Sequence, residues 1–405
     1  EWLAGNIPRL DGADPAMGLA KDEAERAERN LMLQHKLWEG GFGGLCYPKE
    51  YGGQGLPPQY QWAFNDETDG YEMPLLLNGG TLTIQGPTLL DFGTEEQKQK
   101  YLAPIVRGEQ LWVQFLSEPT GGSDLAGVLT RATRDGDDFI LNGSKIWSSN
   151  AFHGDYAICV ARTNWEVSKH RGITVFIVKI HQPGIHVEQI KQVNGGTEFC
   201  QEYFDDVHIP ASDVLGEVDN GWTVVTRLLF HERNAVGGAS PYAVGVRRGQ
   251  ARGGRGDAFE LARQTDQTDD RRVRQLVAEA HTLSVVQGQL NERVTLGINT
   301  GKLPEPAGSL MRLFTAVSHV RQVNIGLEIA GTRAVTWAPG SSTGRFGVNF
   351  LFRQGLCLGG GSNEMQRNII SERVLGMPRE RSEDRDLPFN QVRHNAMPAR
   401  RSGTP

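Results

Sequence analysis

The sequence predicts an α+β protein with a helical N-terminal domain, a central β domain and a C-terminal helical bundle. Three observations support this order. Apolar residues recur at helical spacing up to about Leu111, short runs rich in β-branched and aromatic residues follow to about Leu215, and helical spacing then returns. We place the domains at 1–111, 112–217 and 218–380, followed by an extended tail at 381–405. At 405 residues the chain is long enough for three cores.

Two helices of the N-terminal domain have clear ends. The stretch "DEAERAERNLMLQHKLWEGG" has apolar residues three and four positions apart and stops at Gly40 and Gly41, which is typical of a helix C-terminus. The stretch "TEEQKQKYLAPIVRGE" begins at Thr94, a good N-cap, with Glu96 close behind. The opening "EWLAGNIP" also reads as helical, so the natural chain is expected to begin a few residues earlier.

The central domain is predicted from six short alternating runs: "LWVQFLSE", "TRATRDGDDFILNGSKIWSS", "DYAICVART", "GITVFIVKI", "GIHVEQI" and "EYFDDVHI". Turn sequences such as "DGD", "NGS" and "PG" separate them. We therefore expect antiparallel strands in a small barrel or sandwich.

After Gly216 four long helical segments follow, which is typical of a bundle. The basic stretch "RRGQARGGRG", Arg247 to Gly256, resembles an RNA-binding segment, but it lacks aromatic residues and is better read as a turn between helices. The tail after Pro378 is charged and contains proline, so we expect it to be extended or partly disordered.

Composition excludes several functional classes. The net charge of -6 argues against nucleic acid as the main partner. No apolar run approaches the roughly 18 residues that span a bilayer, and no signal peptide opens the chain. The four cysteines are scattered without metal-ligand spacing, so we predict no metal site and a reducing compartment, the cytoplasm.

Three motifs carry the candidate chemistry. "LSEPTGGSDLAG", Leu116 to Gly127, offers hydroxyls and free amides that suit an anion or the polar edge of a flat cofactor, or else form a polar turn. "NGSKIWSSN" holds Trp147, which could stack on a ring system or lie in the core. "LGGGSNEMQR" places three glycines before a helix, either as a ligand cradle or as a tight turn.

Taken in order, these motifs resemble the acyl-CoA dehydrogenase family over nearly the whole chain. "FLSEPTGGSDLAG" is similar to its first signature, "SKIWSSNA" to its flavin-stacking strand, and "GGGSNEMQRNIISERVLGMPRE" to its C-terminal signature. The resemblance implies FAD between the β domain and the bundle, and removal of an α-proton and a β-hydride from an acyl-CoA. The cofactor contacts that it implies are Gln114, Leu116, Ser117, Ser123, Trp147, Ser149, Arg263, Glu328, Ser362 and Glu364.

The catalytic base is the main departure from the commonest pattern. Many members carry Tyr-Glu-Gly-Thr where this chain has Gly359 to Ser362, and the glutamate position is Gly360. A subset acting on branched, long-chain and steroid side-chain thioesters has the base on a bundle helix, followed by arginine. In "LLFHERNAVGG" that pair is Glu232 and Arg233, so the resemblance implies Glu232 as base and the Gly360 N–H as a donor to the thioester oxygen. Without the family, Glu232 would read as a surface carboxylate. Ser123 and Arg233 are the candidate substrate contacts.

Two cofactor contacts also depart from the family. Asp266 follows Arg263 where a phenylalanine is usual, and Glu328 and Thr332 replace a glutamine and a glycine. These acidic residues suit a cofactor pyrophosphate poorly. The resemblance implies a homotetramer or a heterotetramer that shares FAD, with an electron-transfer flavoprotein as acceptor. A non-catalytic partner subunit and an acyl-CoA oxidase are the alternative functions.

Overall fold

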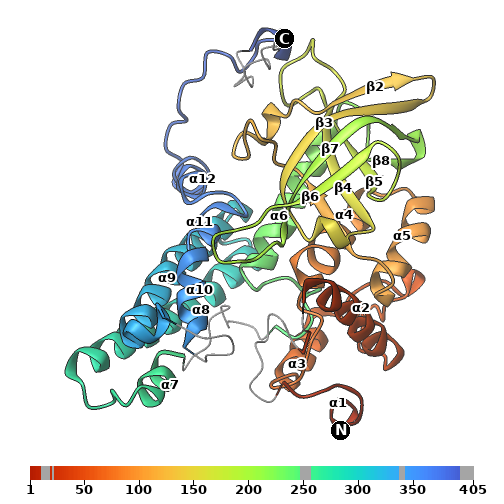
Figure 1. The fold of residues 1–405 in the computed structure, drawn as a ribbon. Coiled ribbons are helices and arrows are strands. Elements are labelled where there is room, and N and C mark those ends of the chain that lie inside the picture. Colours follow the sequence, from red (N-terminus) through yellow and green to blue (C-terminus); the bar gives the residue numbers. More distant parts are fainter. Residues whose placement is uncertain (11–18, 21, 247–256, 337–342, 393–405) are drawn as a thin grey trace, which may run out of the picture.

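The computed structural model describes residues 1–10, 19–20, 22–246, 257–336 and 343–392. The basic stretch 247–256 and the end of the tail, 393–405, lie outside the described residues. Figure 1 shows a β domain with a helical N-terminal part below it on one side and a helical C-terminal part on the other. The predicted α+β class and the order of the three parts are confirmed.

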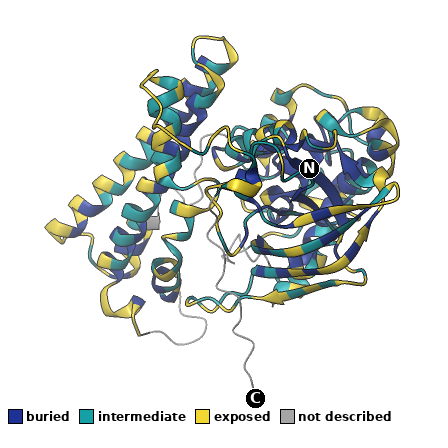
Figure 2. Cartoon of the chain, turned by 90° about the horizontal axis from the view of Figure 1, so that it is seen from above, coloured by how far each residue is buried: buried dark blue, intermediate teal, exposed yellow. Residues whose placement is uncertain are grey.

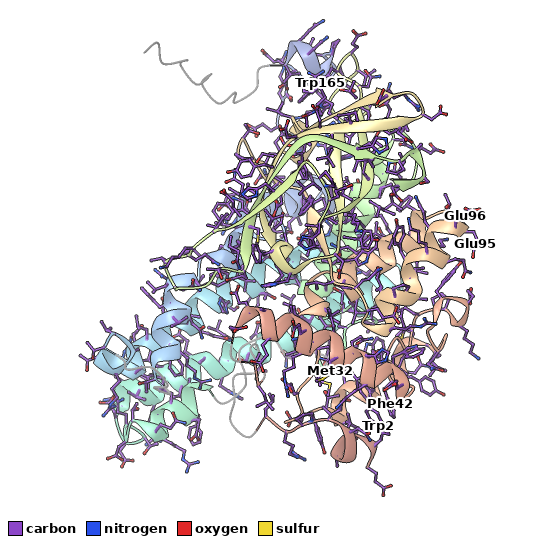
Figure 3. The ribbon with its side chains drawn as sticks, turned by 45° about the vertical axis from the view of Figure 1, so that its right-hand side comes forward. Trp2, Met32, Phe42, Glu95, Glu96 and Trp165 are labelled. Carbon is purple, nitrogen blue, oxygen red and sulfur yellow. The ribbon has the colours of Figure 1, made fainter. Side chains whose placement is uncertain are left out.

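The N-terminal helices begin and end where local chemistry favours it. They are α1 (Trp2–Asn6), α2 (Glu23–Glu39), α3 (Pro58–Glu67), α4 (Gly86–Phe92) and α5 (Glu95–Arg107). Helix α2 ends at Gly40, as predicted. Thr94 caps α5, but its reciprocal partner is Gln97 rather than Glu96, because the third helical position is the one that can reach back. Figure 3 shows Glu95 and Glu96 at the outer edge of the molecule, with Trp2 and Phe42 together below α2.

The β domain is one sheet of eight strands in the described chain. Its strands are β1 (Trp112–Phe115), β2 (Arg131–Asp135), β3 (Asp138–Ser149), β4 (Tyr156–Arg162), β5 (Ile173–Lys179), β6 (Ile185–Gln189), β7 (Phe199–Ile209) and β8 (Val214–Leu215). The order is β6-β7-β3-β2-β4-β5-β8, with β1 paired to β4. The expectation of antiparallel strands throughout is wrong, because β1 and β2 both pair in parallel with β4.

Strands β4 and β5 are buried on both faces rather than alternating between core and solvent. In β4, Ile158 and Val160 pack with the N-terminal helices and α6, whereas Ala157, Cys159 and Ala161 face the core inside the β domain. A strand covered on both sides has no solvent face, so its sequence lacks the polar alternation of an edge strand. The predicted alternation is therefore wrong for these two strands.

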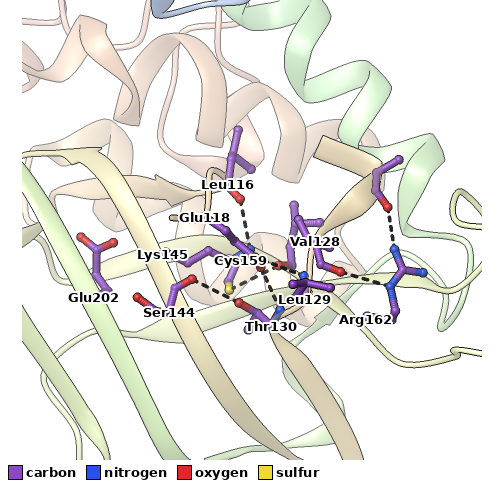
Figure 4. A network of polar contacts seen from close by, with 12 residues as sticks. Leu116, Glu118, Val128, Leu129, Thr130, Ser144, Lys145, Cys159, Arg162 and Glu202 are labelled. Atoms are coloured by element: carbon purple, nitrogen blue, oxygen red, sulfur yellow. Dashed lines mark hydrogen bonds and ion pairs between the residues drawn. The ribbon is translucent and has the colours of Figure 1, made fainter. Parts of the chain in front are cut away.

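A buried polar cluster lies inside the β domain, beside the first motif (Figure 4). Lys145 of β3 is fully buried and donates to Oε1 of Glu118 over 2.9 Å and to the carbonyl of Leu116 over 3.1 Å. Glu118 also accepts from the backbone N–H groups of Leu129 and Thr130. Because each charge is paired or hydrogen-bonded, the cluster fixes both ends of the loop 116–130.

A second buried carboxyl group, Glu202 of β7, bonds no cation among the described residues and accepts a 2.9 Å hydrogen bond from Ser148. Burial raises the pKa of Glu202 from 4.5 to about 8. A carboxyl whose pKa is raised in the fold contributes stability fully below about pH 4.5, and this contribution is lost as the pH rises through about 8.

We therefore expect the free energy of unfolding of Glu202→Gln to rise relative to that of the parent protein as the pH increases. The difference should change by on the order of 4 kcal/mol between about pH 5 and about pH 8. Urea unfolding of both proteins at each pH measures this difference. Glu188→Gln is the control, since Glu188 is an exposed carboxylate on the neighbouring strand β6. A free-energy difference that does not change with pH would contradict the prediction.

The C-terminal part contains α6 (Gly221–Val236), α7 (Asp257–Gln264), α8 (Arg271–Asn299), α9 (Gly308–Ala330), α10 (Gly344–Phe352), α11 (Gly355–Leu358) and α12 (Asn363–Ile369). Helix α6 contacts α4, β5 and α9, so it joins all three parts of the molecule. The described part of the tail, 381–392, has no long helix or strand and returns to the β domain, where the buried Phe389 ring packs under Arg162 and beside Trp165.

Candidate active site

Glu232 lies near the end of α6, on the face that carries the buried residues Leu228 and His231. Its side chain is 8% exposed, so the interpretation as a surface carboxylate is wrong. Gln114 of β1 donates from Nε2 to Oε2 of Glu232 over 3.2 Å. This contact joins two residues 118 positions apart and places Glu232 between the β domain and the bundle.

The electrostatics of the site leave Glu232 a stronger proton acceptor than an exposed glutamate. Burial raises its pKa, while the hydrogen bond from Gln114 and the cations Arg233 and Arg312 act in the opposite direction. Removing a carboxylate from water favours its protonated form, which is the property that a general base needs.

The glycine motif forms a turn between α11 and α12 that approaches Glu232. Gly360 and Gly361 have φ angles of 72° and 83°, a region that side chains rarely adopt. A Cβ atom built on Gly360 would lie 3.2 Å from Oε1 of Glu232. Ser362 caps α12, since its side chain accepts from the N–H of Met365. The turn therefore leaves room for Glu232 where a side chain at position 360 would stand.

Sequence reasoning missed Arg312 of α9. Its side chain is fully buried, and Nη2 donates to the carbonyls of Leu356, over 2.5 Å, and Gly359. The available signal was a single arginine among apolar residues in "GSLMRLFTAV". A buried arginine needs acceptors, and here the carbonyls of Leu356 in α11 and Gly359 at the start of the glycine turn accept from Nη2.

Trp147 occupies a bulge in β3 and has a φ angle of 66°. Its indole is 55% exposed, and Phe199 meets it edge to face with the ring centroids 6.0 Å apart. One indole face is therefore available to a flat ring, and the core interpretation is wrong. Ser149, two residues on, is also exposed. Gln114 retains a buried Oε1 without a partner among the described residues. These features fit a polar ring system.

The first motif is tied to the strand that carries Trp147. The carbonyl of Leu116 accepts from Lys145, and the carbonyl of Ser117 accepts from the N–H of Ile146. Ser123 lies further along the loop and is exposed. The backbone of this motif thus bonds the residue that precedes Trp147.

The remaining candidates do not join this group within one chain. Arg263 pairs with Glu260 on α7, and Glu328 pairs with Arg272 and Arg321, all on exposed surfaces of the bundle. Glu364 is exposed and pairs with Arg367. Arg233 is half-buried, and burial lowers its pKa. Across the described residues no cluster of His, Cys, Asp or Glu suits a metal ion, and none of the described helices could span a membrane.

Comparison with known proteins gives three matches in chain order. The N-terminal, middle and C-terminal domain models of acyl-CoA dehydrogenases match residues 16–109, 114–207 and 219–375. The chain belongs to the acyl-CoA dehydrogenase family. It is therefore an oxidoreductase acting on acyl-CoA and a FAD-dependent flavoprotein, as the resemblance implied.

Similar members extend over nearly the same length. Acyl-CoA dehydrogenase IpdE1 of Mycobacterium tuberculosis is 33% identical over 384 residues, which cover 94% of this chain and 96% of that protein. The solved Tcur3481-Tcur3483 steroid ACAD is 30% identical with a TM-score of 0.76, covering 89% of this chain and 94% of that one. The ChsE4-ChsE5 complex from M. tuberculosis gives 30% identity and a TM-score of 0.71, covering 88% and 93%.

Proposed function

We propose that this acyl-CoA dehydrogenase forms a 2,3-enoyl-CoA from an acyl-CoA, with Glu232 as the general base. The observation that carries the proposal is the buried carboxylate of Glu232, facing a glycine turn that leaves space beside Oε1. A buried carboxylate with a raised pKa, set against a turn that leaves room beside it, is a candidate general base.

The residues of the chain then have distinct tasks. Glu232 takes the α-proton of the acyl group, and Gln114 holds the carboxylate through Oε2, leaving Oε1 toward Gly360. The N–H of Gly360 donates to the thioester oxygen, which stabilises charge that develops there. Gln114, Leu116 and Ser117 would border the FAD ring on one side and Trp147 and Ser149 on the other. Ser123 would lie near the pyrophosphate or the substrate. When bound, FAD supplies the acceptor for the β-hydride.

For the acyl group, we propose a ring-bearing or branched chain, with a steroid side chain as the leading candidate. The similarity to a steroid ACAD and the absence of side chains at Gly359 to Gly361 support this proposal. Glycines in this turn remove volume where a linear acyl chain would otherwise be confined. Arg233 and Ser123 are the proposed substrate contacts.

For the assembly, we propose a tetramer in which Arg263, Glu328, Ser362 and Glu364 meet FAD at a subunit boundary. Arg263 and Glu328 lie on exposed surfaces of the bundle, whose helices carry half-buried and exposed residues (Figure 2). A complex of two named chains among the similar structures makes a related second subunit a suitable partner. We further propose an electron-transfer flavoprotein as acceptor and, since all four cysteines are free thiols, a cytoplasmic location.

The visible spectrum of the purified protein tests this proposal. We expect a flavin spectrum that bleaches under anaerobic conditions when a suitable thioester is added. The panel consists of octanoyl-CoA, isovaleryl-CoA, cyclohexanepropionyl-CoA and cholanoyl-CoA. We expect the two ring-bearing thioesters to bleach the flavin fastest. A protein that binds FAD but is bleached by no acyl-CoA of the panel would overturn the proposed reaction.

A further inference from the structure

We propose that Arg312 is a positioning residue that holds the glycine turn against Glu232 and keeps the carboxylate ready to accept a proton. The inference rests on the proposed function, since it assigns a role toward the proposed base. Glu232, Arg312 and Gly360 come from α6, α9 and the turn between α11 and α12, so only the packed fold brings them together.

The contacts of Arg312 explain the shape of the turn. Its Nη2 donates to the carbonyl of Leu356, in α11, and to the carbonyl of Gly359, directly after that helix. These two carbonyls lie at the end of a four-residue helix, where backbone acceptors lack helical partners. One guanidinium therefore fixes the residues that precede the two left-handed glycines.

Arg312 also lies close to the carboxylate. A Cβ atom on Gly360 would be 3.2 Å from Nε of Arg312 and 3.2 Å from Oε1 of Glu232, so both groups border the same small volume. Nε and Nη1 have no hydrogen-bond partner among the described residues, although they are buried. A cation in this place favours the ionised form of Glu232 and opposes the effect of burial.

Other charges near Glu232 are few in the described structure. Arg233 follows it on α6 and acts in the same direction as Arg312. Beyond Arg233 lie Arg373, after α12, and Glu305, before α9. Gln114 from β1 is uncharged. Of Arg233 and Arg312, only Arg312 donates a hydrogen bond to the glycine turn among the described residues. This difference makes its role testable.

The test compares Arg312→Met and Arg312→Lys with the parent holoenzyme. The thioester of the panel that bleaches the flavin fastest is titrated to saturation at each pH, and the rate of flavin reduction is measured at each concentration. For Arg312→Met we expect a limiting rate of flavin reduction at least tenfold lower, with a half-saturating thioester concentration that changes by less than about threefold. The midpoint of the plot of rate against pH should lie about one unit higher. Arg312→Lys keeps the charge, so we expect the parent midpoint with a rate roughly fivefold lower.

Hydrogen exchange reports on the glycine turn independently of catalysis. Amide hydrogen exchange of a peptide spanning residues 355–362 is expected to rise about tenfold or more in Arg312→Met. Arg227→Met is the matched control, because that arginine lies on α6 but pairs with Asp91. It should leave the rate, the pH midpoint and exchange in the turn unchanged.

The outcomes separate this proposal from the proposed function. Parent-like rate, midpoint and exchange in Arg312→Met would overturn the positioning role even if Glu232→Gln is inactive. An active Glu232→Gln would overturn the assignment of the base, whatever Arg312 does. If Arg312→Met fails to fold, Arg312→Lys decides between the outcomes. A parent-like rate of flavin reduction and parent-like hydrogen exchange in the turn would overturn the positioning role. A lower rate with an unchanged half-saturating thioester concentration would support it.

Discussion

Glu232→Gln is expected to lower the rate of flavin reduction by an acyl-CoA by roughly three orders of magnitude. The amide keeps the size of the side chain and can still accept from Gln114, but it cannot take the α-proton. Flavin absorbance should remain as in the parent protein, because the amide preserves the shape of the side chain and Glu232 is not itself one of the proposed flavin contacts. Anaerobic stopped-flow absorbance with the best thioester of the panel measures the effect.

The control for this substitution is Glu39→Gln, at the exposed end of α2. It removes one carboxylate from the same protein without touching the site, so we expect the parent rate. A Glu232→Gln protein that binds FAD and keeps more than about a tenth of the parent rate would show that another group takes the proton.

Gly360→Ala is expected to slow flavin reduction at least tenfold while the protein still folds. The added Cβ would lie 3.2 Å from both Oε1 of Glu232 and Nε of Arg312, closer than most such contacts, so these side chains must move. The φ angle of 72° adds about 1 kcal/mol of backbone strain for alanine. Displacement of the base by a few tenths of an ångström misaligns it with the substrate carbon.

Gly376→Ala separates the effect of backbone strain from the effect of the added Cβ atom beside Glu232. Gly376 has a φ angle of 68°, close to that of Gly360, but a Cβ there would meet nothing within 4 Å. The same backbone strain should therefore lower the unfolding midpoint of Gly376→Ala, while its rate of flavin reduction stays at the parent value. Equal rates for the two alanine variants would mean that the space beside Glu232 has no part in the reaction.

Local signals predicted much of the fold. Gly40 ends α2 and Thr94 begins α5, because helix caps depend on nearby residues. The six predicted β runs contain the strands β1 to β6 and all of β7 except its first three residues. Strand pairing was less accessible, since the parallel contact of β1 with β4 depends on where the β2–β3 hairpin lies. Burial of β4 on both faces likewise depends on α6 and the N-terminal helices.

The candidate site divides in the same way. Trp147, the first motif and the glycine turn were found from the sequence, and Glu232 from the resemblance. The sequence could not reveal that Trp147 is exposed on a bulge, or that Arg312 bonds the turn. Arg263 and Glu328 lie away from the other candidates in a single chain, so their proposed roles need a second subunit.

By itself, the sequence determined the order of the domains, the family and the absence of a carboxylate at position 360, since these depend on residue type and spacing. Only the tertiary structure decided that Glu232 is buried, that its Oε1 faces Gly360, and that Arg312 lies beside both. The physical reason is that burial and charge act through space. Glu232 is buried where α6 meets β1, α9 and the glycine turn, whose residues are far apart along the chain, and this burial raises its pKa.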